Sequence, residues 1–269
     1  MNKFLKRLRI GLLGGAYLLW CFFTWILPYS NHPEKYPLST RYGKARKLVT
    51  FILKLLKADL RVENRIELNT EGSMFFACNH LSVLDPLFLV ALSPKPIRFI
   101  AKIETKKLPF AGRILRAMDA LFLDRDDPRQ AIAIFKQAQL SIEKKEAHVC
   151  IFPEGTRNKH PYEKDVKEFH PGSFKIPQRS KMPITPVCVF GTHHLLGNSP
   201  LHRHYLVSIS FLRETNAEAV AKMKTVEIAD TIHEAVEEKF VALRQEDLAY
   251  FASKSYKGKA NKWWKDLPR

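Results

Sequence analysis

Cysteine is scarce in this sequence of 269 residues, and its four cysteines form no CxxC pair. They are widely spaced, at Cys21, Cys78, Cys150 and Cys188. Neither a zinc knuckle nor a disulfide framework is indicated, so we expect reduced, small hydrophobic side chains. The pairs His193-His194 and His202-x-His204 have no acidic or cysteine partner at a recognisable spacing, so no metal site is expected.

The sequence also lacks the GxSxG motif that exposes a nucleophilic serine in many hydrolases, which argues against a serine hydrolase centred on Ser82. Internal repeats and low-complexity linkers are missing too. A chain of this length buries one good core, so we expect one catalytic domain with appendages. The predicted parts are an N-terminal membrane-associating segment (residues 1–60), a catalytic domain (61–214) and a C-terminal helix with a basic tail (215–269).

Acidic residues are outnumbered, with 27 Asp and Glu against 44 Lys and Arg, a net charge of +17. Such a charge suits nucleic acid, an anionic bilayer or a phosphorylated substrate. Residues 10–27 contain no charged side chain, which favours the bilayer and gives no reason to expect a nucleic-acid partner. We therefore expect association with an anionic membrane surface, on the cytoplasmic face.

The apolar N-terminal run is short for a membrane span. Eighteen residues give a helix of about 27 Å, against a hydrocarbon core of roughly 30 Å. Basic residues flank the run on both sides, whereas a single crossing satisfies the positive-inside preference on one side only. We favour a helix that dips into one leaflet over a true span. Residues 44–57 have an amphipathic pattern and are predicted to form an interfacial helix after it.

Short apolar runs alternate with helical patterns through the body of the chain, which predicts an α/β fold with a mostly parallel central sheet flanked by helices. The expected strands are residues 74–78, 97–101, 120–123, 149–152, 184–190 and 205–211. The expected helices are residues 86–92, 109–118, 128–143 and 216–245. The tail around Trp263 and Trp264 is either a headgroup contact or a solvated segment.

A histidine and an aspartate follow the first expected strand, as His80-x4-Asp85. An imidazole whose one nitrogen is held by a carboxylate can use the other nitrogen as a general base. Five residues on one regular helix are roughly 140° out of alignment, so a catalytic pair requires His80 to precede the helix. The alternative is that Asp85 caps the helix before Pro86 and that His80 is an ordinary loop residue.

A second polar segment, Phe-Pro-Glu-Gly-Thr-Arg at residues 152–157, follows another expected strand. It supplies a carboxylate, a flexible glycine, a hydroxyl and the guanidinium of Arg157, which suits bidentate capture of a phosphate. In isolation, the commoner outcome for such a segment is a tight strand-to-loop turn with a surface glutamate and arginine.

Four ordered blocks together resemble the glycerolipid acyltransferases, specifically the 1-acyl-sn-glycerol-3-phosphate acyltransferase family. They are His80-x4-Asp85, Phe-Leu-Asp-Arg at residues 122–125, Phe-Pro-Glu-Gly-Thr-Arg at 152–157 and Met-Pro-Ile-Thr-Pro-Val at 182–187. The His170-Pro171 pair departs from the family pattern after the third block, where lysine and glycine are commoner.

The resemblance implies roles for individual residues. His80 is the expected base and Asp85 its partner, while Lys102, Arg125 and Arg157 are the expected phosphate contacts. Lys106 and Lys107 compete with Lys102 for this assignment. Glu154, Gly155 and Thr156 are expected to shape the acceptor site.

The implied reaction transfers an acyl chain from acyl-carrier protein or coenzyme A to the sn-2 hydroxyl of lysophosphatidic acid, giving phosphatidic acid. No cofactor and no covalent enzyme intermediate are expected. Another acceptor of the same superfamily, such as glycerol 3-phosphate, another lysophospholipid or a lyso-aminolipid, remains the alternative.

Overall fold

The computed structural model describes residues 14–65, 72–124, 127–196, 204–257, 262–265 and 267. Within these residues, a seven-stranded sheet has the order β1-β7-β6-β2-β5-β3-β4. Its strands are β1 (Ala58–Glu63), β2 (Phe75–Cys78), β3 (Ile97–Lys102), β4 (Leu121–Leu123), β5 (His148–Ile151), β6 (Ile184–Phe190) and β7 (Tyr205–Phe211). The β6–β7 pair is antiparallel and the other neighbouring pairs are parallel. The prediction of a mostly parallel sheet is therefore confirmed.

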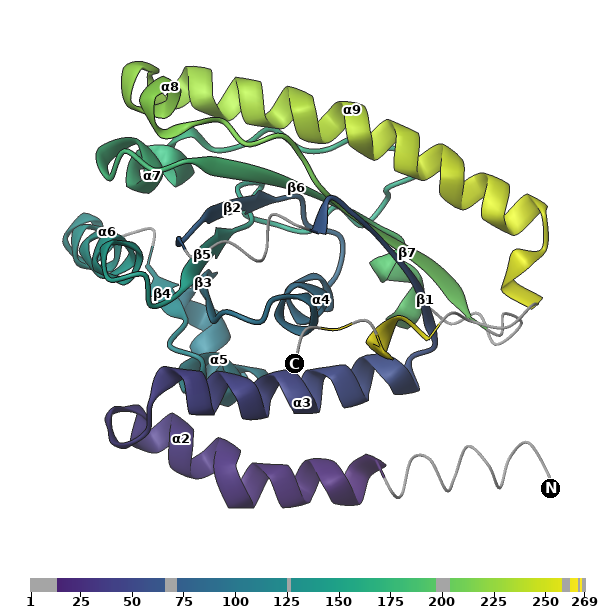
Figure 1. Cartoon of the computed structure of the whole chain (residues 1–269), viewed down its shortest axis with the longest axis horizontal. Helices are drawn as coiled ribbons and strands as arrows, with labels where there is room; N and C mark the ends of the chain where they lie inside the picture. Colours follow the sequence, from purple (N-terminus) through teal and green to yellow (C-terminus); the bar gives the residue numbers. More distant parts are fainter. Residues whose placement is uncertain are drawn as a thin grey trace.

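Helices cover both faces of this sheet (Figure 1). The α-helices of the described residues are α2 (Leu27–Asn31), α3 (Leu38–Leu55), α4 (Asp85–Leu92), α5 (Ala111–Ala117), α6 (Pro128–Glu143), α7 (Lys175–Arg179), α8 (Ala217–Lys222) and α9 (Thr225–Ala252). On β2, Phe76 and Cys78 join the core beneath α3 and α4, whereas Phe75 and Ala77 join the core beneath α6 and α9. Every residue of β2 is buried because both faces are covered.

The six expected strands are all present, and α6 has the predicted bounds. Strand β1 was missed, and the predicted boundary at residue 60 falls inside it. The expected C-terminal helix is divided into α8 and α9, because Met223 and Lys224 have extended backbones. Glu227 accepts a hydrogen bond from the Lys224 backbone nitrogen at 2.7 Å, which caps the start of α9.

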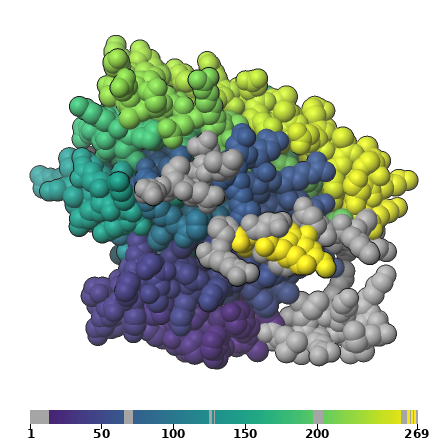
Figure 2. All heavy atoms as spheres, in the orientation of Figure 1, coloured from purple at the N-terminus to yellow at the C-terminus, as the bar shows by residue number. Residues whose placement is uncertain are grey.

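The N-terminal segment forms a helical layer outside α3, shown in purple in Figures 1 and 2. Residues 14–21 are helical and continue through a π-helical turn (Phe22–Ile26) into α2. One side of this layer is buried, at Cys21, Trp25 and Ile26. The other side exposes Leu19, Trp20 and Phe23, whose exposed fractions are 62%, 59% and 65%. Searching the parts of the chain that the structure describes, we find no helix with both the length and the apolarity needed to cross a membrane.

Two expectations about the chain ends are corrected by packing. Leu48 and Val49, on the α3 face assigned to a membrane interface, are buried in the protein core instead. Trp263 is also buried, with its ring centroid 6.3 Å from that of Phe88, so its indole is neither solvated nor at a headgroup.

A bidentate ion pair fastens α3 to the turn between α5 and β4. Arg41 is 4% exposed. Its Nη1 and Nη2 atoms donate to the two carboxylate oxygens of Asp119 at 2.6 and 2.9 Å. Nη1 also donates to the Ala117 carbonyl at 2.7 Å. These hydrogen bonds therefore anchor α3 to the turn that leads into β4.

Candidate active site

The expected functional segments gather at one edge of the sheet because they follow parallel strands. His80 comes after β2 and residues 152–157 come after β5, while Lys102 is the last residue of β3. Strands β2, β3 and β5 run in one direction, so their carboxyl ends, where α/β folds present functional groups, lie at the same edge. Arg125, expected at the end of β4, lies outside the described residues.

His80 and Asp85 form a hydrogen-bonded pair. The His80 Nδ1 atom lies 2.7 Å from the Asp85 Oδ2 atom. Asp85 is the first residue of α4 and is fully buried, whereas His80 lies in the preceding loop. This is the pre-helical position that the spacing required of a catalytic pair. This is the geometry expected of a general base and the carboxylate that orients it.

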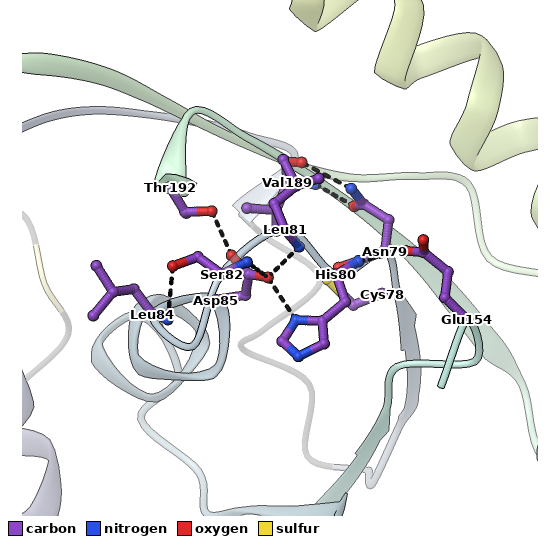
Figure 3. A network of polar contacts seen from close by, with 10 residues as sticks. All are labelled: Cys78, Asn79, His80, Leu81, Ser82, Leu84, Asp85, Glu154, Val189 and Thr192. Atoms are coloured by element: carbon purple, nitrogen blue, oxygen red, sulfur yellow. Dashed lines mark hydrogen bonds and ion pairs between the residues drawn. The ribbon is translucent and has the colours of Figure 1, made fainter. Parts of the chain in front are cut away.

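The imidazole of His80 is held between a carboxylate and an aromatic ring. Its centroid lies 4.2 Å from that of Phe152, with an interplanar angle of 27°. The second ring nitrogen points away from Asp85 (Figure 3) and has no hydrogen-bond partner in the described ranges. The side chain is 20% exposed. With Nδ1 donating to Asp85, Nε2 is left as the proton acceptor.

Asp85 is held by more than its histidine partner. Its Oδ2 atom accepts hydrogen bonds from the backbone nitrogens of Leu81 at 2.7 Å and Ser82 at 2.8 Å. Its Oδ1 atom accepts a hydrogen bond from the Thr192 hydroxyl at 2.5 Å. Sequence reasoning missed Thr192; the one available signal was its position just after the expected strand at residues 184–190.

Ser82 has a structural rather than a nucleophilic position. It is 4% exposed, and its hydroxyl oxygen accepts a hydrogen bond from the Leu84 backbone nitrogen at 3.3 Å. Its own backbone nitrogen donates a hydrogen bond to the Asp85 carboxylate. Ser82 therefore shapes the loop between His80 and α4.

Glu154 is buried behind the dyad and connects two loops. Its Oε1 atom accepts a hydrogen bond from the His80 backbone nitrogen at 2.5 Å, and its Oε2 atom accepts one from the Lys167 backbone nitrogen at 3.3 Å. Burial raises the pKa of this carboxyl to about 7, although both hydrogen bonds act to lower it. Glu154 is 3% exposed and contacts the dyad through the His80 backbone, while its expected role at the acceptor site stays a prediction.

The last three residues of the Phe-Pro-Glu-Gly-Thr-Arg segment lead from the core to the surface. Gly155 has a φ of 64° and donates its backbone nitrogen to the Phe152 carbonyl at 3.0 Å. A residue without a side chain adopts this left-handed conformation at little cost. Thr156 and Arg157 follow it and are exposed, as is Lys102. These exposed side chains can reach a ligand without rearrangement of the core.

The sheet is mostly parallel, carries a histidine–carboxylate pair at its strand ends and exposes an arginine and a lysine at the same edge. This is the arrangement that the resemblance to glycerolipid acyltransferases predicts. A family model described as Acyltransferase matches residues 59–190, the region that contains all four sequence blocks. The chain therefore contains a domain of this acyltransferase family, over residues 59–190.

Similar curated proteins bear consistent names. A "Probable 1-acyl-sn-glycerol-3-phosphate acyltransferase" of Mycoplasma pneumoniae is 32% identical over 61% of this chain and 61% of its own length. One with the same name from Mycoplasma genitalium is 26% identical over 80% of this chain and 82% of its own length. The 1-acyl-sn-glycerol-3-phosphate acyltransferase of Saccharomyces cerevisiae is 29% identical over 67% and 59%. The matched region thus spans about three fifths of the first and third of these relatives.

The fold is also found in a solved structure. The crystal structure of the 1-acyl-sn-glycerophosphate (LPA) acyltransferase, PlsC, from Thermotoga maritima matches with a TM-score of 0.62 and 21% sequence identity. The match covers 88% of this chain and 98% of that chain. It includes far more of the chain than the family model, so the likeness extends beyond the four blocks.

Proposed function

We propose that the protein transfers an acyl chain from a thioester to the sn-2 hydroxyl of 1-acyl-sn-glycerol 3-phosphate, forming phosphatidic acid. The observation that carries this proposal is the His80–Asp85 pair, 2.7 Å apart, at the strand edge that also presents residues 152–157. The names of the relatives support lysophosphatidic acid as the acceptor.

The reaction needs one base. His80 Nε2 removes the proton of the acceptor hydroxyl as the oxygen attacks the thioester carbonyl carbon. Asp85 stabilises the imidazolium that forms. The tetrahedral intermediate collapses by breaking its carbon–sulfur bond, and the thiolate takes the proton back from His80. The products are the ester and the free thiol, with no covalent bond to the enzyme.

The acceptor phosphate is proposed to contact the cations that follow the strands. Arg157 offers a planar pair of donors that matches phosphate oxygens, and Lys102 offers a point charge. Both are exposed, at the carboxyl ends of strands that run parallel to β2. Arg125 is proposed as a third contact on the basis of the family motif alone.

The protein is proposed to act at the surface of an anionic membrane, on the cytoplasmic face. Leu19, Trp20 and Phe23 form an exposed apolar strip on the N-terminal helix. An apolar strip on a protein with a net charge of +17 suits an interface that combines acyl chains and negative headgroups. The acyl donor, from coenzyme A or acyl-carrier protein, is itself anionic. The reaction as written needs no cofactor.

The acceptor is tested with purified, detergent-solubilised protein and oleoyl thioesters of both carriers. Lysophosphatidic acid, glycerol 3-phosphate and lysophosphatidylcholine are offered in separate reactions, and the lipid products are identified by mass spectrometry. The proposal predicts phosphatidic acid from lysophosphatidic acid and far less product from the other two. Preferential acylation of either alternative acceptor would show that the proposed acceptor is wrong.

A further inference from the structure

The buried carboxylate of Asp85 receives its contacts from two distant parts of the chain. Its Oδ2 atom is satisfied locally, by His80, Leu81 and Ser82. Its Oδ1 atom accepts from Thr192, 107 residues further along, at 2.5 Å. Asp85 and Thr192 are both 0% exposed, so water does not reach either side chain. A buried acceptor that loses its donor carries the full cost of its desolvation.

The Thr192 hydroxyl acts on the carboxylate oxygen that His80 does not use. A carboxylate held at one oxygen only can rotate about its terminal torsion, which has a broad energy profile. A donor fixed at Oδ1 restricts that rotation and keeps Oδ2 aimed at His80 Nδ1. Figure 3 shows the Thr192 hydroxyl directed at Asp85 from the opposite side to the imidazole.

The position of Thr192 is determined by the glycine before it. Gly191 has a φ of 87°, and a Cβ atom there would lie 2.1 Å from the Leu206 carbonyl oxygen. Only glycine fits this close approach and this left-handed conformation. The chain therefore leaves β6 through a fixed turn and begins the 3-10 helix Thr192–Leu196 at once.

The middle of this short helix contacts α9 through His194. His194 Nε2 lies 3.1 Å from Asp247 Oδ2 and 2.9 Å from the Tyr162 hydroxyl. The Tyr162 hydroxyl also donates to Asp247, which is 1% exposed. Thr192 is thus held between a tight turn and a polar cluster on α9, so its hydroxyl has little freedom to follow a moving carboxylate.

We propose that Thr192 is a positioning residue for the reaction, which holds the Asp85 carboxylate in the plane that orients His80. The proposal rests on the proposed acyl transfer and adds a residue outside the four sequence blocks. Thr192 acts through Asp85 and touches no substrate. Its loss should therefore lower kcat and leave the KM values for acceptor and donor nearly unchanged.

The test compares Thr192→Val, which replaces the hydroxyl by a methyl group, with Thr192→Ser, which keeps the hydroxyl. Thr185→Val is the matched control, because Thr185 is also a fully buried threonine, on β6 itself. Its hydroxyl has no hydrogen-bond partner in the part of the chain that the structure describes. Phosphatidic acid formation is measured over a range of acceptor concentrations, and thermal unfolding of each variant is measured alongside.

We expect Thr192→Val to lower kcat by about 10- to 100-fold, with KM changed by less than about threefold. Thr192→Ser should keep kcat within about threefold of wild type, and Thr185→Val should match wild type. Should Thr192→Val fail to fold, Thr192→Ala removes the same donor without adding a methyl group, and it should show the same loss of kcat.

Unchanged kcat in the folded Val or Ala variant would overturn the proposal, as would a serine variant as impaired as the valine variant. A change confined to KM would also overturn it. Failure of the proposed acceptor is distinguishable, since wild type would then acylate a different lysolipid. The same three variants would be compared on that lipid.

Discussion

The carboxylate of Glu154 accepts a hydrogen bond from the backbone nitrogen of His80 at 2.5 Å, which joins the segment after β5 to the loop that carries the base. A second hydrogen bond, from the Lys167 backbone nitrogen, extends this connection to a third loop. The arrangement puts a buried ionisable group behind the dyad. Its burial has consequences for how stability depends on pH.

Glu154 should make the folded state less stable as pH rises. Its pKa in the folded state is about 7, above its ordinary value of 4.5. Between these values the folded state binds more protons than the unfolded state, so the free energy of unfolding falls with rising pH. The free energy of unfolding of wild type, minus that of Glu154→Gln, should therefore decrease by about 3 kcal/mol from pH 4.5 to 7.5. Urea unfolding of both proteins across this range measures it, and a difference independent of pH would contradict the assignment.

Arg157→Ala should weaken use of the phosphorylated acceptor. A charge-assisted hydrogen bond contributes about 1.5–3 kcal/mol, so we expect KM for lysophosphatidic acid to rise about 10- to 100-fold, with a smaller effect on kcat. The control is Arg179→Ala, which removes an exposed cation from α7, a helix that precedes β6 and so lies toward the opposite edge of the sheet. Steady-state kinetics measures KM for lysophosphatidic acid in both variants. Equal increases in KM would indicate that Arg157 contributes only net charge.

The exposed strip on the N-terminal helix should govern binding to membranes. The double variant Leu19→Ser with Phe23→Ser should bind vesicles of phosphatidylcholine and phosphatidylglycerol at least about tenfold more weakly, because two large apolar side chains no longer enter the interface. The matched control replaces Ile132 and Leu140, which are exposed on α6 at 62% and 41%. Co-sedimentation with vesicles measures both. Equal loss in the two double variants would exclude a specific role for the N-terminal strip.

Asp119→Asn should destabilise the fold by leaving Arg41 without its carboxylate. Breaking a buried pair costs about 3–5 kcal/mol, and the 25% exposure of the Asp119 side chain reduces the expected loss to about 2 kcal/mol. Asparagine tolerates the positive φ of 55° at this position, so the backbone is preserved. Glu163→Gln, at an exposed pair with His160, should change the unfolding free energy by less than about 0.5 kcal/mol. Denaturant unfolding of both variants measures these losses of unfolding free energy. Similar losses in the two variants would contradict the stabilising role of the Arg41–Asp119 ion pair.

The sheet and the dyad could be predicted from the sequence because each depends on local signals. Apolar runs bounded by turn residues marked β2 to β7, and the spacing of His80 and Asp85 required the loop position that the structure has. Strand β1 was missed because its sequence, Ala-Asp-Leu-Arg-Val-Glu, alternates with charged residues and directly follows a helix. The resulting pattern lacks the continuous apolar run of the inner strands.

Other features depend on long-range packing, which no local pattern shows. The apolar face of α3 is compatible with either a bilayer or a protein core, and the protein core is where Leu48 and Val49 lie. Thr192 meets Asp85 only because β6 lies beside β2, and its position just after an expected strand did not reveal this contact. The roles assigned to all the site residues, from His80 and Asp85 to Arg157, stay predictions until variants are measured.

The central claim is that His80 is the base of an acyl transfer. The most direct measurement is a single-turnover reaction of purified wild type and His80→Ala with lysophosphatidic acid and an oleoyl thioester, followed by mass spectrometry of the lipids. The account predicts phosphatidic acid from wild type and a loss of at least about 1,000-fold in the rate constant for His80→Ala. Equal rates of phosphatidic acid formation by the two proteins would contradict it.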